Sequence, residues 1–244
     1  MKKDKRHFSL EQFNDIDSSA EVNNYFYPVL EEIDKITTFK DKIVLDVGCG
    51  TGIFVAPFAK SFQQLIGIDG ETSVAQRSID NGYSEVKEIN DFCYDKLPFK
   101  DSSFDLVICK DVFEHLIDPL HLLREIHRIT KVNGHFLFHV PNHFPLFKRL
   151  RFVFKNNLDT YNFFPESDCW DNPHLRFYNE RDILNRMNNV GFKNHKNLSH
   201  HFPAFPLIRK LGFSPTLIAA IQNRLPDHFN AGFTYLFERS SKDV

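Results

Sequence analysis

The sequence predicts an α/β protein: a doubly wound, mostly parallel sheet with helices on both faces, an N-terminal helical cap and an inserted lid. Two observations support this prediction. Short apolar runs alternate with stretches of helical periodicity between about residues 42 and 140, which is typical of a parallel sheet covered by helices. The first apolar run also leads directly into a glycine-rich turn at 48–52, as the first strand of a nucleotide-binding fold does.

The composition is that of an ordinary globular protein. The chain has 244 residues, of which 25% are charged and 42% hydrophobic, and its formal net charge is −2. One α/β domain with a lid therefore fits better than two independent domains. The near-neutral charge gives no reason to expect a nucleic acid as the main partner.

Several absences in the sequence favour a cytoplasmic protein without a metal centre. The basic residues near the start are not followed by an apolar run, and no stretch approaches the ~20 apolar residues that span a bilayer. The four cysteines form no CxxC pair, so we expect reduced thiols. The twelve histidines show no HExxH or other ligand spacing, and no metal is expected.

The first element along the chain is a predicted amphipathic helix. Apolar residues recur at helical spacing across 19–37, and Pro28 is expected to kink this helix or to divide it in two. We therefore assign residues 1–40 to a helical cap and residues 41–244 to the main domain.

The main domain begins with strands and helices in turn. Asp118 and Pro119 are good start signals for a helix, and Gly134 is expected to lie at its end. The apolar runs predict strands at 43–47, 64–68, 84–89, 105–109 and 134–140, with further helices at 53–60 and 71–81.

The second half of the chain departs from this rhythm in two places. Residues 141–177 are rich in proline, asparagine and aromatic side chains, and residues 203–226 are apolar and interrupted by proline. We interpret both segments as lid insertions. Asn179 begins a helix that Gly191 closes, and the segments around 192–200 and 231–239 are expected to be the last two strands.

A glycine turn, Gly48-Cys49-Gly50-Thr51-Gly52, lies between the first strand and the following predicted helix. Glycines allow the chain to turn sharply and let a ligand approach main-chain N–H groups that a Cβ atom would block. Asp69 ends the next strand, where a carboxylate can accept hydrogen bonds from both hydroxyls of a ribose. The pattern predicts a nucleotide-binding turn.

Asp46, two residues before this turn, separates two classes of cofactor. A dinucleotide would bring a pyrophosphate to the turn, where this carboxylate would repel it, and Ile53 replaces the last glycine of the G-x-G-x-x-G spacing. S-adenosylmethionine (SAM) instead presents an ammonium and a sulfonium group, which a carboxylate attracts. A purely structural turn, with Asp46 as a helix cap, is the remaining interpretation.

These residues resemble the motifs of the class I SAM-dependent methyltransferases. VLDVGCGTG at 44–52 is similar to the first motif of that superfamily, IGIDG at 66–70 to the second, and residues 88–119 to later ones, with a weaker match at 174–192. The most similar branch contains ubiquinone-type and MetW-like methyltransferases. The resemblance implies a seven-stranded sheet with a reversed last pair and SAM across the carboxyl ends of the strands.

The resemblance also implies which residues bind SAM. Asp46 and the glycine turn would face its methionine part, while Asp69 would bind the ribose. The full set, carried over position by position, is Asp46, Gly48, Cys49, Gly50, Thr51, Gly52, Asp69, Gly70, Asp91, Phe92, Lys110 and Asp111.

The positions at the adenine end are implied with one alternative. Asp91 would accept a hydrogen bond from the adenine amino group, and Phe92 would pack or donate its N–H there. The segment DFCYDKLPF is about one residue longer than the family spacing, so Asp95 could take the place of Asp91. Lys110 and Asp111 would end the fourth strand beside the sulfonium.

Methyl transfer from a sulfonium needs an aligned acceptor, and it needs a base only where the acceptor is an un-ionised hydroxyl. Histidines suit that task because of their pKa. His115 belongs to the Glu-His pair that the family also has, and His143 follows the fifth strand beside the same cleft. We name both as candidate bases, whereas His139, in the middle of the strand, is expected to be a core residue.

Four further residues are candidates for substrate contact. Tyr25 and Tyr27 of the cap could close over the cofactor, where aromatic rings suit a sulfonium. His174 and Arg176 resemble the recurring His-x-Arg of the family. Arg176 would either bind an anionic group of the substrate or fasten the lid to the domain.

The segment 147–155 mixes cations with large apolar side chains. It predicts either a lid helix whose apolar face covers the pocket or a surface helix that contacts anionic lipid or a lipid-linked substrate. We prefer the lid helix, and keep peripheral membrane contact as the alternative.

Taken together, the sequence predicts an SAM-dependent methyltransferase (EC 2.1.1) that acts on an oxygen, or on a ring carbon, of a small or lipid-linked metabolite. One alternative is a protein of the same fold that regulates or assists another enzyme. An NAD-dependent oxidoreductase is a further alternative, which Asp46 and Ile53 disfavour.

Overall fold

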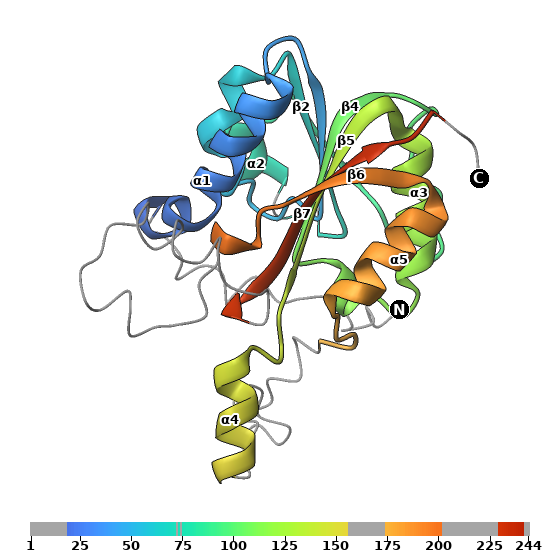
Figure 1. Ribbon diagram of the computed structural model, residues 1–244. Helices are drawn as coiled ribbons and strands as arrows, with labels where there is room; N and C mark the ends of the chain where they lie inside the picture. The colour runs from blue at the N-terminus through green and yellow to red at the C-terminus, as the bar shows by residue number, and fades with distance from the viewer. Residues whose placement is uncertain (1–18, 72, 74, 156–173, 202–228, 242–244) are drawn as a thin grey trace, which may run out of the picture.

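A computed structural model contains the predicted doubly wound sheet, and it describes residues 19–71, 73, 75–155, 174–201 and 229–241 (Figure 1). Seven strands form one sheet in the order β3-β2-β1-β4-β5-β7-β6. Strands β1 to β5 are parallel, whereas β7 is antiparallel to both of its neighbours. The seven-stranded, mostly parallel sheet is therefore confirmed; of the last pair, β7 alone is reversed, and it lies between β5 and the edge strand β6.

All seven predicted strands are present, with shifted ends. β5 is longer than expected because it already begins at Thr130. β1 lies at the centre of the parallel part, where Asp46 pairs with Gly67 of β2 and Ile108 of β4. The strands are β1 Ile43–Val47, β2 Gln64–Asp69, β3 Glu85–Glu88, β4 Phe104–Lys110, β5 Thr130–Pro141, β6 Phe192–Asn197 and β7 Gly232–Arg239.

The helices begin and end largely at the predicted capping residues. Asp118 accepts a hydrogen bond from the Leu120 N–H at the start of α3, and Asn179 accepts one from Asp182 at the start of α5. Gly191 closes α5 with a left-handed φ of 105°. The α-helices are α1 Ser19–Thr37, α2 Ala75–Asp80, α3 Pro119–Ile129, α4 Leu146–Lys155 and α5 Glu180–Val190; the 3₁₀-helices are η2 Ala56–Ser61, η4 Phe113–His115 and η5 Ser199–His201.

Two local predictions were wrong. The expected helix at 53–60 is a series of turns followed by the 3₁₀-helix η2, because Pro57 has no N–H to donate within an α-helix that began at Ile53. Gly134 does not end a helix either. α3 already ends at Ile129, and Gly134 lies inside β5, where a side chain would meet the Lys131 carbonyl oxygen at 2.8 Å. The sheet at this point requires close packing rather than a left-handed turn.

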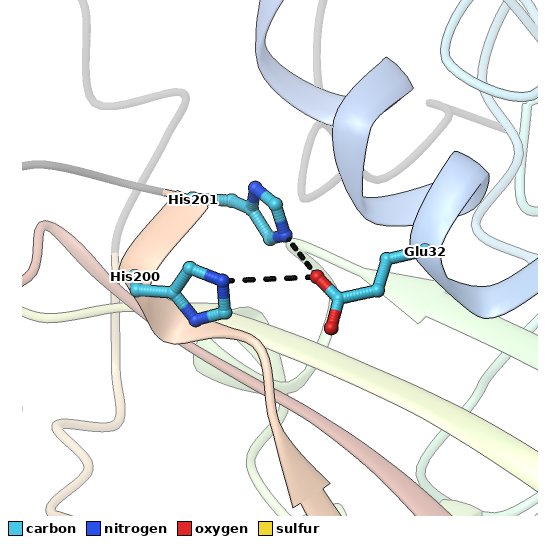
Figure 2. Close-up of side chains that lie close together, drawn as sticks. All are labelled: Glu32, His200 and His201. Carbon is cyan, nitrogen blue, oxygen red and sulfur yellow. Dashed lines mark hydrogen bonds and ion pairs between the residues drawn. The ribbon is translucent and has the colours of Figure 1, made fainter. Parts of the chain in front are cut away.

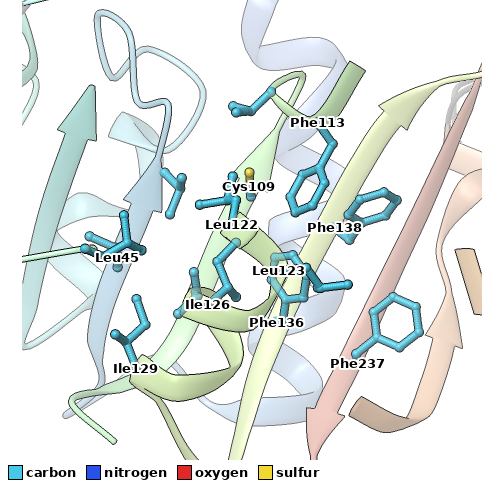
Figure 3. Packing of buried hydrophobic residues seen from close by; sticks show 14 of the residues in the cluster. Leu45, Cys109, Phe113, Leu122, Leu123, Ile126, Ile129, Phe136, Phe138 and Phe237 are labelled. Carbon is cyan, nitrogen blue, oxygen red and sulfur yellow. The ribbon is translucent and has the colours of Figure 1, made fainter. Parts of the chain in front are cut away.

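The sheet is covered on both faces. Figure 3 shows how α3 directs Leu122, Leu123, Ile126 and Ile129 at the sheet, against residues such as Phe136 and Phe138 of β5. On the opposite face, α1 buries four apolar residues against β1, β4 and η2; these are Phe26, Val29, Leu30 and Ile33. Because helices cover both faces of the sheet, the carboxyl ends of the parallel strands remain accessible between the connecting loops. Ligands of such folds bind at these strand ends.

The predicted cap and lid lie partly outside the described residues. Pro28 lies within α1, which is assigned as one continuous helix. Of the two predicted lid insertions, 156–173 and all of 203–226 are not described, and α4 is the helical part of the first. α4 stands away from the sheet at the lower end of the molecule (Figure 1). Among the described helices, none combines the length and apolar character needed to cross a membrane.

Candidate functional site

The glycine turn, residues 48–52, follows β1 with three left-handed glycines at alternate positions. Their φ angles are 71° at Gly48, 52° at Gly50 and 76° at Gly52. A Cβ atom on Gly48 would lie 2.3 Å from Val112, and one on Gly52 would lie 2.5 Å from Tyr83. At Gly50, by contrast, no described heavy atom lies within 4 Å of that position. The turn is therefore packed at both ends and open in the middle.

Asp69 at the end of β2 fastens the middle of the turn. One of its carboxylate oxygens accepts a hydrogen bond from the Gly50 N–H at 2.8 Å, and the other accepts one from the Glu71 N–H at 3.0 Å. Burial raises the pKa of Asp69 above its ordinary value, against the effect of these backbone donors. The acid expected to bind a ribose therefore lies beside the open position, with Gly70 directly after it.

Asp46 is buried beneath the turn rather than exposed beside it. It accepts a hydrogen bond of 2.5 Å from the Tyr83 hydroxyl. Burial raises the pKa of Asp46 to about 7, a rise that the Tyr83 hydrogen bond opposes and the charge of Asp69 increases. Sequence reasoning missed Tyr83, because it precedes β3 and only the fold brings it to β1.

Two more side chains that the sequence did not point to hold the turn from the side of α2. The Ser78 hydroxyl donates to the Gly50 carbonyl at 2.7 Å, and the Asn81 amide donates to the Thr51 carbonyl at 2.8 Å. Cys49 is buried between them and the sheet. With its carbonyls engaged, the turn keeps one backbone geometry.

Lys110 and Asp111 lie at the end of β4, as the resemblance implies. The Lys110 ammonium contacts the Asp111 carboxylate and lies 3.9 Å from the centre of the Phe54 ring. Although burial would raise the pKa of Asp111, Lys110 and then His139 hold it below its ordinary value. Asp111 also has a left-handed φ of 54°. The strand thus ends on an ionised carboxylate in a constrained turn.

The two alternative acids at the adenine end lie in one loop after β3. The Asp91 N–H donates to the Asp95 carboxylate at 3.0 Å, and the Asp91 carboxylate accepts from the Cys93 N–H at 2.7 Å. Phe92 is half-buried and packs against the core on the α3 side. Both acids remain candidates for the adenine contact.

A histidine cluster lies at the carboxyl ends of β4 and β5. It consists of His115 in η4, His143 after β5, and His174 at the start of the next described segment. A hydrogen bond of 2.7 Å joins His143 Nε2 to His174 Nδ1, and the ring centres of His115 and His174 are 4.7 Å apart. Burial, followed by the influence of His174, lowers the pKa of His143 to about 4, so this imidazole is neutral at pH 7.

Glu114 joins this cluster from beneath. Its carboxyl group is buried, and the Oε2 atom has no hydrogen-bond partner among the residues described here. Burial, and then the charge of Asp111, raise the pKa of Glu114 to about 8, so it is largely protonated at pH 7. Donor atoms of Glu114, His115 and His174 lie within 4.8 Å of one another, a spacing that would also accept a metal ion.

The remaining candidates are placed differently. His139 is buried and bonded to the Thr234 hydroxyl at 2.7 Å, as expected of a core histidine. Arg176 donates to the carbonyls of Leu116 and Ile117 and so fastens its segment to the loop after η4. Tyr27 is 43% exposed and packs on Phe58 of η2. Tyr25 lies in α1, and its side chain is outside the described part of the structure.

Comparison with known families decides between the cofactor classes. A family model described as a methyltransferase domain matches residues 22–197. The chain belongs to this methyltransferase family. The family implies SAM as the methyl donor. The matched region includes the glycine turn, the buried acids Asp46 and Glu114, and all three residues of the histidine cluster.

The individual relatives of this chain are distant. It is 30% identical over 115 residues to a ubiquinone biosynthesis O-methyltransferase of Coxiella burnetii, covering 46% of the chain and 49% of the relative. It is 29% identical over 99 residues to the uncharacterized methyltransferase YcgJ of Bacillus subtilis, covering 38% of each. The matched region thus spans about half, or less, of these curated relatives.

Solved structures show the same fold. A putative methyltransferase of Haloferax volcanii, in complex with the methyltransferase activator Trm112, superimposes with a TM-score of 0.61 at 15% identity, covering 96% of this chain and 99% of that one. At this identity the similarity shows the fold alone.

The buried carboxyl group of Asp46 makes a testable prediction about stability. Its folded pKa of about 7 lies above the ordinary 3.8, so its ionisation has no effect on stability below about pH 4 and increasingly destabilises the fold as the pH rises toward 7. The free energy of unfolding of Asp46→Asn minus that of the wild type should therefore be about 2 kcal/mol larger at pH 8 than at pH 5. Urea unfolding at both pH values, without cofactor, measures this difference.

Tyr83→Phe is the companion variant. It removes the hydrogen bond that stabilises the Asp46 carboxylate, so it should make the loss of stability toward pH 8 steeper than in the wild type. If Asp46→Asn and the wild type changed in parallel with pH, the raised pKa of Asp46 would be wrong.

Proposed function

We propose that this chain transfers the methyl group of SAM to an oxygen, or to a ring carbon, of a small or lipid-linked metabolite. The observation that carries the proposal is the open position at Gly50, which lies directly beside Asp69 and above the buried Asp46. The histidine cluster lies on the same edge of the sheet, at the carboxyl ends of β4 and β5. A cofactor at the turn and an acceptor at the histidines would therefore be neighbours.

The charges around the turn suit SAM. Asp46 and Asp69 lie beneath and beside the turn, and the ionised Asp111 ends β4. SAM, when bound, supplies a methyl group activated by a sulfonium, and its two cations are attracted by these carboxylates. A pyrophosphate would meet the same acids unfavourably, which agrees with the family match in disfavouring an NAD-dependent oxidoreductase.

We assign the parts of the cofactor to the residues that the sequence implied. The glycine turn, with Cys49 and Thr51, would face the methionine part, and Asp69 and Gly70 the ribose and adenosine. Asp91 and Phe92 would border the adenine, and Lys110 and Asp111 the sulfonium. A carboxylate can accept about four hydrogen bonds, so Asp69 can still receive a hydroxyl beside its backbone donors Gly50, Glu71 and Gly70.

A glycine comparison tests the cofactor site. Gly50→Ala puts a methyl group into the open position, so it should weaken binding of S-adenosylhomocysteine at least tenfold, while its left-handed φ costs about 1–2 kcal/mol of stability. Isothermal titration measures the affinity.

Gly191→Ala is the matched control for this comparison. Gly191 also has a left-handed φ, and a Cβ atom there would lie 2.7 Å from His127, far along the chain from the turn. This variant should lose stability but keep the wild-type affinity. Equal binding by Gly50→Ala and the wild type would contradict the proposed site.

An oxygen acceptor fits the histidine cluster. Two of the curated relatives are named ubiquinone biosynthesis O-methyltransferases, and His143 is neutral at pH 7, as a group that accepts the proton of an acceptor hydroxyl must be. In the transfer, the new bond forms between the acceptor oxygen and the methyl carbon, the sulfur keeps the electron pair, and the hydroxyl proton passes to the imidazole. His174, bonded to His143, orients that ring.

This role of His143 predicts a dependence on the acidity of the acceptor. With labelled SAM and a simple phenol or catechol at pH 8, His143→Gln should lower kcat by about 10²-fold or more, because a positioned base is lost. With a nitro-substituted ring that is already ionised, the loss should shrink to a few-fold. A loss of equal size for both acceptors would argue against His143 as the base.

Two further results of that assay are informative. His195→Gln changes an exposed histidine of β6 and should leave the rate unchanged. Binding of S-adenosylhomocysteine without any labelled product, even from a cell extract, would instead favour the alternative of a protein that assists another enzyme.

We propose further that α4 contacts a lipid surface or the tail of a lipid-linked acceptor. Four of its large apolar side chains are exposed to solvent; these are Leu150, Phe152, Val153 and Phe154, the last at 81%. Exposed apolar residues interleaved with Lys148, Arg149 and Arg151 are typical of a helix at a membrane interface. This exposure favours the membrane alternative over the lid helix that we preferred from the sequence.

Vesicle flotation tests the role of α4. The wild type should float with vesicles that contain anionic lipid, and the double variant Phe152→Ser/Phe154→Ser should lose most of this binding, because burial of each ring contributes about 1.5–3 kcal/mol. Tyr94→Ser is the control, since Tyr94 is 66% exposed elsewhere. Equal flotation of all three proteins would rule out α4 as the contact.

A further inference from the structure

Glu32, His200 and His201 form a second cluster, which we call the α1–η5 cluster. Figure 2 shows Glu32 extending from α1 and the two imidazoles from η5, with both rings directed at the same carboxylate oxygen. The Nε2 atom of His201 lies 2.7 Å from Glu32 Oε2, and that of His200 lies 3.7 Å from it. His200 and His201 are adjacent, but Glu32 lies far from them in the sequence, so no ligand-spacing pattern pointed to the cluster.

The distances suit a shared metal ion. One donor atom from each residue lies within 4.8 Å of the other two. Around a tetrahedral Zn²⁺ with bonds of about 2.0–2.1 Å, ligand atoms are separated by roughly 3.4 Å. The two distances from the carboxylate oxygen, 2.7 Å and 3.7 Å, lie on either side of that value, so small side-chain rotations would complete the geometry.

The surroundings favour a bound ion as well. The imidazoles are each 12% exposed and the carboxylate is 26% exposed, so the donors are shielded but reachable. Lys196 binds the other oxygen, Oε1, at 2.7 Å. That contact leaves Oε2 to the imidazoles and fixes the orientation of the carboxylate, as outer partners of metal ligands commonly do.

We propose that Glu32, His200 and His201 bind a divalent transition-metal ion of the Zn²⁺ class. Two imidazole nitrogens and one carboxylate oxygen are a donor set that such ions prefer over Mg²⁺ or Ca²⁺, which favour oxygen alone. Water or another ligand would complete the coordination. The ion would join α1 to η5, and so fix the helical cap against the segment that leads into residue 202.

Metal titration of the full-length chain tests this proposal. The protein is stripped with EDTA and titrated with ZnCl₂ in the absence of SAM, by calorimetry and by thermal unfolding. The wild type should bind Zn²⁺ at micromolar concentration or below, and an excess of about a hundred times Kd should raise its unfolding midpoint by roughly 5 °C. Glu32→Gln and His201→Gln should each weaken binding at least tenfold and abolish the rise.

A matched control lies one residue away. Glu31 is on the exposed side of α1 and pairs only loosely with Lys35, at 3.7 Å, so Glu31→Gln should bind Zn²⁺ like the wild type. His200→Gln provides a third ligand variant if either of the others unfolds. If the variants of Glu32, His200 and His201 bound Zn²⁺ as tightly as the wild type, the proposal would be overturned. The ion would then lie at another cluster, such as Glu114–His115–His174.

The absence of saturable Zn²⁺ binding by the wild type would overturn it too. In that case the cluster is a direct contact between α1 and η5, in which the two imidazoles meet the Glu32 carboxylate without an ion. Because SAM is absent throughout, neither result depends on the proposed methyl transfer, and a failure of that function would leave the metal measurement unchanged.

Discussion

The hydrogen bond from the Gly50 N–H to the Asp69 carboxylate is the contact on which the site depends. It joins the turn after β1 to the end of β2, and so converts two neighbouring strand ends into one rigid rim. The left-handed glycines make this contact possible, because the chain must reverse within five residues and still present an N–H to Asp69. Ser78 and Asn81 then hold the carbonyls of the same turn from α2. What is left open is the single position at Gly50.

Burial of acids beneath this rim has a cost in stability that folding alone does not explain. The carboxyl groups of Asp46 and Glu114 are both almost completely buried, and both have raised pKa values. A sequence selected only for stability would have replaced them with neutral residues. Asp46, beneath the open glycine, stands where a binding site for a cationic ligand requires a carboxyl group, whereas Glu114 is largely neutral at pH 7 and belongs to the histidine cluster.

The sequence predicted the sheet and the capping residues of α3 and α5, and it pointed to the glycine turn and Asp69, which the structure brings into contact, because these follow from local patterns. The prediction of a helix at 53–60 was wrong because of Pro57. The prediction that Gly134 ends a helix was wrong because glycine also permits close packing within a strand. Tyr83 and the α1–η5 cluster were missed for a different reason. Their partners come from distant parts of the chain, and only the register of the sheet and the packing of α1 bring them together.

The glycine-turn side and the histidine-cluster side of the site differ in charge, and the difference suits them to the cofactor and the acceptor respectively. On the side of the turn, Lys110 and His139 keep Asp111 ionised, which suits a sulfonium. On the side of the histidines, burial keeps Glu114 protonated and His143 neutral at pH 7. A neutral imidazole can take a proton from an uncharged hydroxyl, whereas a protonated one could not.

Because Asp111 and Glu114 are only three residues apart, the charge state of each depends on that of the other. Ionised Asp111 raises the pKa of Glu114, and the resulting neutral carboxyl group spares the pocket a second negative charge. The loop from β4 through η4 therefore links the protonation of Asp111, beside the turn, to that of Glu114, beside the histidines.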